Sequence, residues 1–108
     1  MGGALPGEHI ARLRDVTTPP AGFRRASAAL STLVLAEALR DLEAAASTVQ
    51  TPIAQAAAIR PARRVTLVPV LRAGLALMEP ALRLLPEWTR VGFLGMARDE
   101  TTLQPKFY

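Results

Sequence analysis

From Val65 to Tyr108 the chain reads VTLVPVLRAGLALMEPALRLLPEWTRVGFLGMARDETTLQPKFY, and the fold class follows from this part. It opens with a near-continuous apolar run, Val65–Leu71, typical of a strand buried on both faces of a parallel sheet. Apolar residues then recur at helical spacing, at Leu75, Met78, Leu82 and Leu85, and Pro86 ends the segment. A second apolar run, Val91–Met96, completes a strand–helix–strand unit, whose crossover we expect to be right-handed.

An arginine follows each predicted strand: Arg72 after the first and Arg98 after the second. In open α/β sheets ligands bind outside the carboxyl ends of the strands, so we expect both side chains to face a common ligand. Each guanidinium stays charged, and its planar fork of donors suits phosphate oxygens. Gly74 lets the backbone approach a ligand, with amides near a helix N-terminus. The pattern predicts an anion site, and the alternative for each arginine is a solvated loop charge.

The same part of the chain resembles the uracil phosphoribosyltransferase family. VPVLRAGLALMEPALRLLP and VGFLGMARDETTLQP are similar to the segments that read roughly VPILRAGL-M and G-YRDEETL-P in that family. Weaker matches lie upstream in the family's order, namely Leu13-Arg14-Asp15, Thr18, Phe23-Arg24, Glu37–Leu42 and Thr51-Pro52-Ile53. The resemblance covers nearly the whole chain, but only the N-terminal half of the family's length.

The resemblance implies a partial type I phosphoribosyltransferase-like α/β fold, with parallel strands, flanking helices and an incomplete sheet. Residues 19–108 would form the N-terminal part of that domain, after a flexible or short-helical segment in residues 1–18. Family members transfer ribose 5-phosphate from phosphoribosyl diphosphate to N1 of uracil, giving UMP and diphosphate, with Mg²⁺ as cofactor. By resemblance, the residues on the diphosphate side of the donor are Arg72, Ala73, Gly74 and Arg98. No catalytic residue and no metal ligand is assigned.

Two parts of the family's site have no counterpart in the sequence. One is the loop Asp-Pro-Met-Leu-Ala-Thr-Gly-Gly-Ser, which cradles the 5-phosphate, and the other is the C-terminal segment that recognises uracil. The family's tyrosine before the second arginine is replaced by Ala97. We therefore expect half of a site, with weak anion binding and no useful turnover by this chain alone.

Partners are implied partly by the half-fold and partly by the family. Two parallel strands with two or three helices leave apolar surface uncovered, so we expect a homo-oligomer or a complex with the missing half. In relatives, the region around Val49–Ile53 contributes an arm to the dimer contact. Some relatives have a GTP regulator, which the basic run Arg60–Arg64 could reach, although such a run is more often only solvated.

Composition limits the other function classes. The chain has 108 residues, no cysteine and a single histidine, His9, which argues for one domain without disulfides, thiolate metal sites or a histidine-based triad. Its net charge of +4 favours anionic partners, but five aromatic residues are few for single-strand nucleic-acid binding, so nucleic acid is not favoured. A non-catalytic basic module that binds RNA or a full-length relative is the rival function. No secretory signal or membrane span is recognisable, so we expect a cytoplasmic protein without a membrane partner.

The remaining elements are expected as follows. Thr17-Thr18-Pro19-Pro20 is typical of a hydroxyl-capped helix start, and the helix is predicted to run to about Ala46. Val49–Ile53 is suited only to an edge strand because Pro52 interrupts it, and the alanine tract Gln55–Ile59 remains unassigned. Pro80 lies where the chain should already be helical, so we expect a kink or a restart at Glu79-Pro80, since an interior proline costs about 3 kcal/mol.

Overall fold

The computed structural model describes residues 2–108, which form an α/β fold. The three helices are α1 (Ala4–Arg14), α2 (Pro20–Ala38) and α3 (Leu75–Leu84). The strands are β1 (Ala44–Gln50), β2 (Gln55–Pro61), β3 (Thr66–Leu67), β4 (Val70–Leu71), β5 (Arg90–Val91), β6 (Leu94–Arg98) and β7 (Pro105–Phe107). Parallel strands around α3 confirm the predicted strand–helix–strand unit and the predicted fold class.

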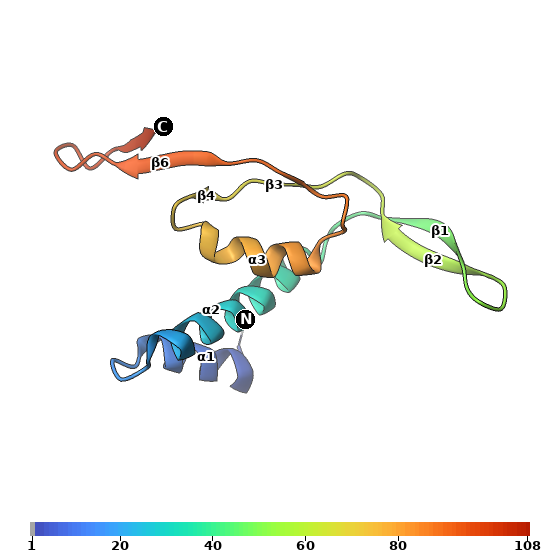
Figure 1. The fold of residues 1–108 in the computed structure, drawn as a ribbon, viewed down its shortest axis with the longest axis horizontal. Helices are drawn as coiled ribbons and strands as arrows, with labels where there is room; N and C mark the ends of the chain where they lie inside the picture. Colours follow the sequence, from blue (N-terminus) through green and yellow to red (C-terminus); the bar gives the residue numbers. More distant parts are fainter. Residues whose placement is uncertain (1) are drawn as a thin grey trace.

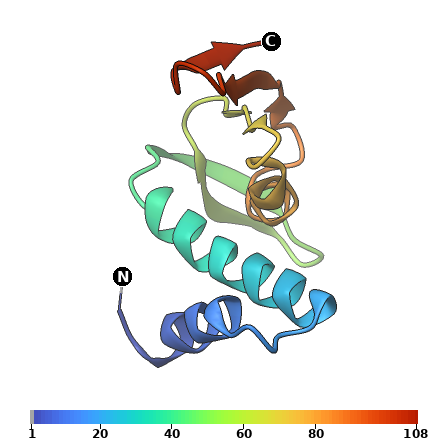
Figure 2. The same ribbon diagram turned by 90° about the vertical axis from the view of Figure 1, so that its left-hand side faces the viewer.

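The elements are stacked in layers (Figures 1 and 2). Helix α1 lies against α2, α2 crosses beside α3, and the strands β3 to β6 lie on the far side of α3. The hairpin β1–β2 projects away from these layers, and β7 lies at the opposite end of the molecule. The molecule is therefore elongated, with principal extents of 60 × 35 × 23 Å.

The parallel unit is one hydrogen-bonded ladder with a gap in its middle. Strand β3 pairs with β5 and β4 pairs with β6, with Leu67 opposite Val91 and Leu71 opposite Gly95. The carbonyls of three alternate residues of the first run accept amides of the second, and these residues are Val65, Leu67 and Pro69. Pro69 has no N–H to donate, so one bond of the ladder is missing and the single predicted strand divides into β3 and β4.

The prediction that the first run is buried on both faces is wrong for this chain. Leu67, Pro69 and Leu71 are partly or fully buried, whereas the alternating Val68 and Val70 are 49% and 41% exposed. Helix α3 lies on one side of these strands only (Figure 2). The apolar pattern indicates that burial of both faces would be favourable. Each face is buried only where another element packs on it, and α3 packs on one of them.

The turn between α1 and α2 is held by threonine hydroxyls, although not by the expected helix cap. The N-cap of α2 is Pro19, and no side chain caps that end. The Thr18 hydroxyl instead donates to the carbonyl of Arg12 at 2.6 Å, and the Thr17 hydroxyl and amide donate to Asp15. Thr18 thus ties the end of α1 to the start of α2.

Helix α2 ends at Ala38, and the prediction that it extends to about Ala46 is wrong. Residues 44–50 form β1, which pairs antiparallel with β2 so that Ala46 lies opposite Ile59 and Val49 opposite Ala56. The connecting turn is closed by Thr51, whose hydroxyl donates to the Ala54 carbonyl and accepts the Ala54 amide. Alanine favours helix locally, but the ladder of the hairpin overrides that weak preference.

Helix α3 contains Pro80 in its interior and does not restart at Glu79-Pro80. Pro80 and Ala81 are the buried residues of α3, and Ala26 and Ser31 are the buried residues of α2. Leu85, just beyond the helix, is the other buried hydrophobic residue of the described part. The core is therefore small and divided, because Pro80 lines a pocket with α2 residues whereas Ala26 lines one with α1 residues. No helix within residues 2–108 is long and apolar enough to cross a membrane.

Candidate phosphate-binding site

The ends of β4 and β6 bring the two predicted arginines to one edge of the sheet. Because Leu71 is opposite Gly95, Arg72 leaves β4 level with the middle of β6, and Arg98 lies at the end of β6. Both residues line a single pocket of about 430 Å³. Ala73 and Gly74 line the same pocket, so the four residues named from the sequence lie in one place.

The loop from Val70 to Gly74 is a tight turn that depends on the glycine. The Gly74 amide donates to the Val70 carbonyl at 2.7 Å, and the Leu75 amide donates to the Arg72 carbonyl at 3.1 Å. A β-carbon at position 74 would lie 2.6 Å from the nitrogen and the oxygen of Val70, and backbone atoms cannot move aside cheaply. Gly74 has ordinary helical angles, so the requirement is close approach and not a left-handed conformation. The Leu71–Arg72 peptide bond is cis.

A second wall of the pocket comes from the turn between β6 and β7. The Asp99 carboxylate accepts the amides of Thr101 and Thr102, each at 2.8 Å. These bonds, with the Thr102 amide contributing most, hold the pKa of Asp99 below its usual value. The Leu103 amide donates to the Asp99 carbonyl, and the Asp99 amide donates to the Gln104 carbonyl. Asp99 therefore stabilises the turn through hydrogen bonds of both its side chain and its backbone.

Leu103 completes this wall in an unusual backbone conformation. Its φ is +60°, in the left-handed region that side chains other than glycine's seldom adopt. Leu103 and Pro105 line the pocket together with the Arg72 loop. The sequence reasoning named neither residue as part of the site. The only available signal was the similarity of the ARDETTLQP segment to the family, because a positive φ at leucine has no signature in composition or spacing.

The charge in the pocket is uncompensated. Arg72 and Arg98 are both exposed, and within residues 2–108 neither makes an ion pair. The ion pairs of the described chain lie elsewhere and are exposed, namely Arg40–Glu37, Arg63–Glu43 and Arg83–Glu79. Two free guanidinium groups at one strand edge are suited to an oxyanion with several charges, such as a diphosphate.

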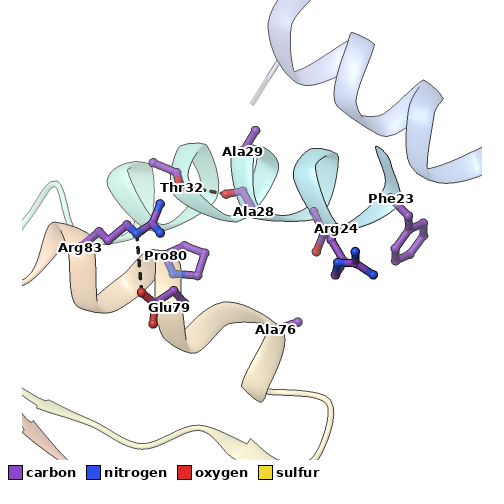
Figure 3. A pocket seen from close by; sticks show the side chains of 10 residues that line it. Phe23, Arg24, Ala28, Ala29, Thr32, Ala76, Glu79, Pro80 and Arg83 are labelled. Carbon is purple, nitrogen blue, oxygen red and sulfur yellow. Dashed lines mark hydrogen bonds and ion pairs between the residues drawn. The ribbon is translucent and has the colours of Figure 1, made fainter. Parts of the chain in front are cut away.

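A larger pocket, of about 600 Å³, lies between α2 and α3 (Figure 3). Alanine side chains form much of its lining, with Phe23 and Arg24 at one end. Glu79 and Arg83 pair with each other at 3.7 Å on α3. Among the described residues, the pocket thus offers one unpaired charge, Arg24, and no arrangement of groups suited to catalysis.

The described residues do not form a metal site of their own. No group of three or more histidine, cysteine, aspartate or glutamate side chains that could hold a metal ion occurs in residues 2–108. Asp99, the carboxylate next to Arg98 in sequence, already accepts two amides. The sequence assigned no metal ligand, and the side chains of this pocket do not fit a metal centre.

Fold and pocket together define a class: an α/β protein that offers a basic pocket at the carboxyl ends of parallel strands. The sequence pattern of the uracil phosphoribosyltransferase family matches residues 6–108. The chain belongs to that family.

Individual relatives agree with this assignment. The chain is 42% identical to a uracil phosphoribosyltransferase of Corynebacterium diphtheriae over 104 residues, which are 96% of this chain and 49% of that protein. A Thermus thermophilus uracil phosphoribosyltransferase is 42% identical over 100 residues, or 92% and 48% of the two chains. The solved structure of the AQ2163 protein from Aquifex aeolicus superimposes with a TM-score of 0.87 at 30% identity, over 100% of this chain and 52% of that one. The chain therefore spans about half the length of the curated relatives it matches.

Proposed function

We propose that this chain supplies the diphosphate-binding half of a uracil phosphoribosyltransferase site. The observation that carries the proposal is one pocket lined by Arg72 and Arg98 from neighbouring parallel strands, together with the Ala73–Gly74 backbone. Membership of the family supports phosphoribosyl diphosphate as the anion and uracil as the acceptor of the complete reaction. The pocket of about 430 Å³ is also large enough for a diphosphate group.

The reaction explains what two guanidinium groups would do. The bond between C1 of the ribose and the diphosphate oxygen breaks, a bond from C1 to N1 of uracil forms, and uracil loses its N1 proton. The electron pair of the broken bond remains on the diphosphate, so negative charge increases there in the transition state. Donors fixed beside the diphosphate stabilise that charge more than they stabilise the ground state. Arg72 and Arg98 are the residues of this chain proposed for that role.

Magnesium, which the family resemblance implies, would have to be held mainly by the donor. Mg²⁺ commonly binds substrate phosphates and several waters, with only one or two protein carboxylates. The described residues provide no preformed cage for it. The arginines then act on diphosphate directly, and their contribution can be measured in binding without metal.

Diphosphate titration tests the assignment of the arginines. We expect Arg72→Ala and Arg98→Ala each to weaken diphosphate binding roughly ten- to a hundredfold in isothermal titration calorimetry, because each removes charge-assisted hydrogen bonds. Arg14→Ala is the matched control, since it removes the same charge from an exposed position of α1. Unchanged affinity in both pocket variants would refute the proposal.

Salt dependence separates this function from the rival basic module. Binding of RNA through many dispersed arginines should weaken steeply as salt is added, whereas a site with two arginines should show a shallow dependence. We also propose that the chain alone forms no UMP from uracil, phosphoribosyl diphosphate and magnesium, because the family's 5-phosphate loop and uracil segment have no counterpart in its sequence. Robust UMP formation would contradict that part.

Two further partners of this function are proposals. The projecting hairpin β1–β2 offers exposed apolar side chains, with Ile53 96% and Ile59 80% exposed, and this supports its use in a contact between copies. A nucleotide regulator such as GTP is supported only by the basic turn before β3, where Arg64 shares a small pocket with Trp88. Arg63 in the same turn already pairs with Glu43 at 2.9 Å, so it is less available.

A further inference from the structure

A cluster of cationic side chains lies apart from the sheet edge, where α1 packs against α2. A pocket of about 240 Å³ opens between these two helices, which lie side by side (Figures 1 and 2). Its lining comes from one face of each helix, because the residues are spaced within one helical turn. The lining residues are Glu8, His9 and Arg12 of α1, and Gly22, Arg25 and Ala26 of α2. None of them lines the pocket of Arg72 and Arg98.

Arg12 is positioned by contacts at its backbone and at its guanidinium. Its carbonyl accepts the Thr18 hydroxyl at 2.6 Å, which ties Arg12 to the turn before α2. Its guanidinium lies across the first turn of α2, with Nη2 2.8 Å from the position that a β-carbon of Gly22 would occupy. Because glycine has no side chain, the charged group can lie directly against the backbone of α2. The guanidinium therefore has a defined position at the pocket.

The positive charge of this cluster is not balanced by ion pairs. Within residues 2–108, neither Arg12 nor Arg25 makes one. Asp15 accepts the amide and the hydroxyl of Thr17, and these two bonds lower its pKa most, with a smaller electrostatic contribution from Arg12. Glu8 is the carboxylate in the lining, so two guanidinium groups face one carboxylate. The pocket keeps an excess of positive charge.

This excess charge opposes the packing of α1 on α2. No residue of α1 is buried, so little apolar burial offsets the repulsion between Arg12 and Arg25. Like charges brought together from two helices destabilise the contact between them. An anion between the two guanidinium groups would contact both helices and replace this repulsion with two attractions.

We propose that the pocket formed by His9, Arg12, Gly22 and Arg25 binds a phosphate dianion, either free or as the phosphoryl group of a small metabolite. Guanidinium groups donate paired hydrogen bonds to phosphate oxygens, and a neutral imidazole has one N–H to donate. The volume of about 240 Å³ suits one phosphoryl group, since pockets for drug-sized ligands begin at about 300 Å³. The site is separate from the diphosphate pocket and does not rest on the proposed function.

Titration of the full chain with inorganic phosphate at constant ionic strength tests the site. We expect the amide NMR signal of Gly22 to shift in a saturable manner. Arg12→Gln and Arg25→Gln should each weaken binding about tenfold or more, because each removes charge-assisted hydrogen bonds. Arg14→Gln is the matched control, since Arg14 is exposed on α1 and does not line the pocket. Arg72→Ala should leave the binding unchanged, which separates this site from the diphosphate pocket.

Gly22→Ala tests the geometry without removing a charge. The added methyl group would displace the flexible end of Arg12 and press on the Thr18 methyl, which lies 3.3 Å from the β-carbon position. Alanine favours helix, so the urea midpoint of this variant should be unchanged or higher. Phosphate binding should nevertheless weaken roughly three- to tenfold, because the Arg12 guanidinium is moved. Gly7→Ala, where a β-carbon meets nothing within 4 Å, should bind phosphate as the parent does.

A parallel titration with glycerol 3-phosphate identifies the source of the phosphoryl group. Tighter binding than that of inorganic phosphate would indicate a phosphorylated metabolite, and weaker binding would indicate free phosphate; both results support the site. No saturable shift with either compound would overturn the inference. Equal affinity of the parent and of Arg12→Gln, Arg25→Gln or Gly22→Ala would also overturn it. Loss of the binding in Arg72→Ala would assign the phosphate to the sheet edge and overturn it as well.

Discussion

Gly74 leaves no room for a side chain in the turn beside the arginine pocket. A side chain there would collide with the backbone of Val70, which the turn itself holds in place. We predict that Gly74→Ala destabilises the chain by about 1–3 kcal/mol, as overpacking does elsewhere, and weakens diphosphate binding by displacing Arg72. Urea unfolding and calorimetry measure the two effects.

Gly7→Ala provides the control for that substitution. Gly7 lies inside α1, and a β-carbon there meets nothing within 4 Å. Alanine is the better helix former, so this variant should be more stable by up to about 1 kcal/mol and bind diphosphate unchanged. Equal stability of the Gly74→Ala variant and the parent would show that the turn is looser than the structure indicates.

Asp99 makes the turn beside the pocket sensitive to acid. Its pKa is lowered in the folded turn, chiefly by the Thr102 amide and then by the Thr101 amide. A carboxyl group whose folded pKa is depressed stabilises the fold above its unfolded pKa of about 3.9, and this contribution is lost as pH falls through the lower folded value. We predict an ordered turn from pH 7 to about pH 5 and its loss below about pH 4.

The amide NMR signals of Thr101 and Thr102 report this transition during a pH titration. Asp99→Asn should remove the pH dependence of both signals, because the amide side chain does not titrate. Glu100→Gln serves as the control with the same charge change, because Glu100 is next to Thr101 in sequence but takes part in neither hydrogen bond. Signals that remain constant down to pH 3 in the parent chain would contradict the assigned role.

At the scale of elements, α3 contains a proline, Pro80, in its interior. Pro80 removes one hydrogen bond inside the helix, which costs about 3 kcal/mol relative to alanine, but its buried ring packs toward α2. Truncating the ring to alanine removes two buried methylene groups, worth roughly 2 kcal/mol with the small cavity included. The backbone term is larger, so we predict that Pro80→Ala stabilises the chain by about 1 kcal/mol.

Urea denaturation of the Pro80→Ala variant measures this difference. Pro86→Ala is the companion variant, since Pro86 lies beyond the end of α3 and removes no helical hydrogen bond. A destabilised Pro80→Ala variant would mean that the packing between α2 and α3 depends on the ring more than these magnitudes allow.

At the scale of the whole molecule, the small core implies weak tertiary stability. The buried hydrophobic residues of the described part are Ala26, Ala81 and Leu85. We predict that the isolated chain binds the dye 1-anilinonaphthalene-8-sulfonate strongly and self-associates or has low solubility, because its apolar strand face remains in water. Dye fluorescence and light scattering over a concentration series measure both. A monodisperse monomer without dye binding would contradict this expectation.

Much of the site could be predicted from local patterns in the sequence. The apolar runs before Arg72 and Arg98 place both residues at the ends of parallel strands, and topology then places them at one edge. The wall formed by Leu103 could not be predicted, because its conformation depends on bonds that the Asp99 turn makes as a whole. Local periodicity identifies strands and loops, whereas the shape of a pocket depends on how separate loops meet.

The sequence by itself determined the strand–helix–strand unit, the glycine turn and the family, because each is encoded in residues adjacent along the chain. Only the tertiary structure decided the hairpin, where pairing between Ala46 and Ile59 overrides the helix preference of alanine. It also decided which side of the parallel strands is left open at Val68 and Leu94. The physical reason is that strand pairing and burial depend on two segments at once. An apolar residue indicates that its burial is favourable, but not which segment buries it.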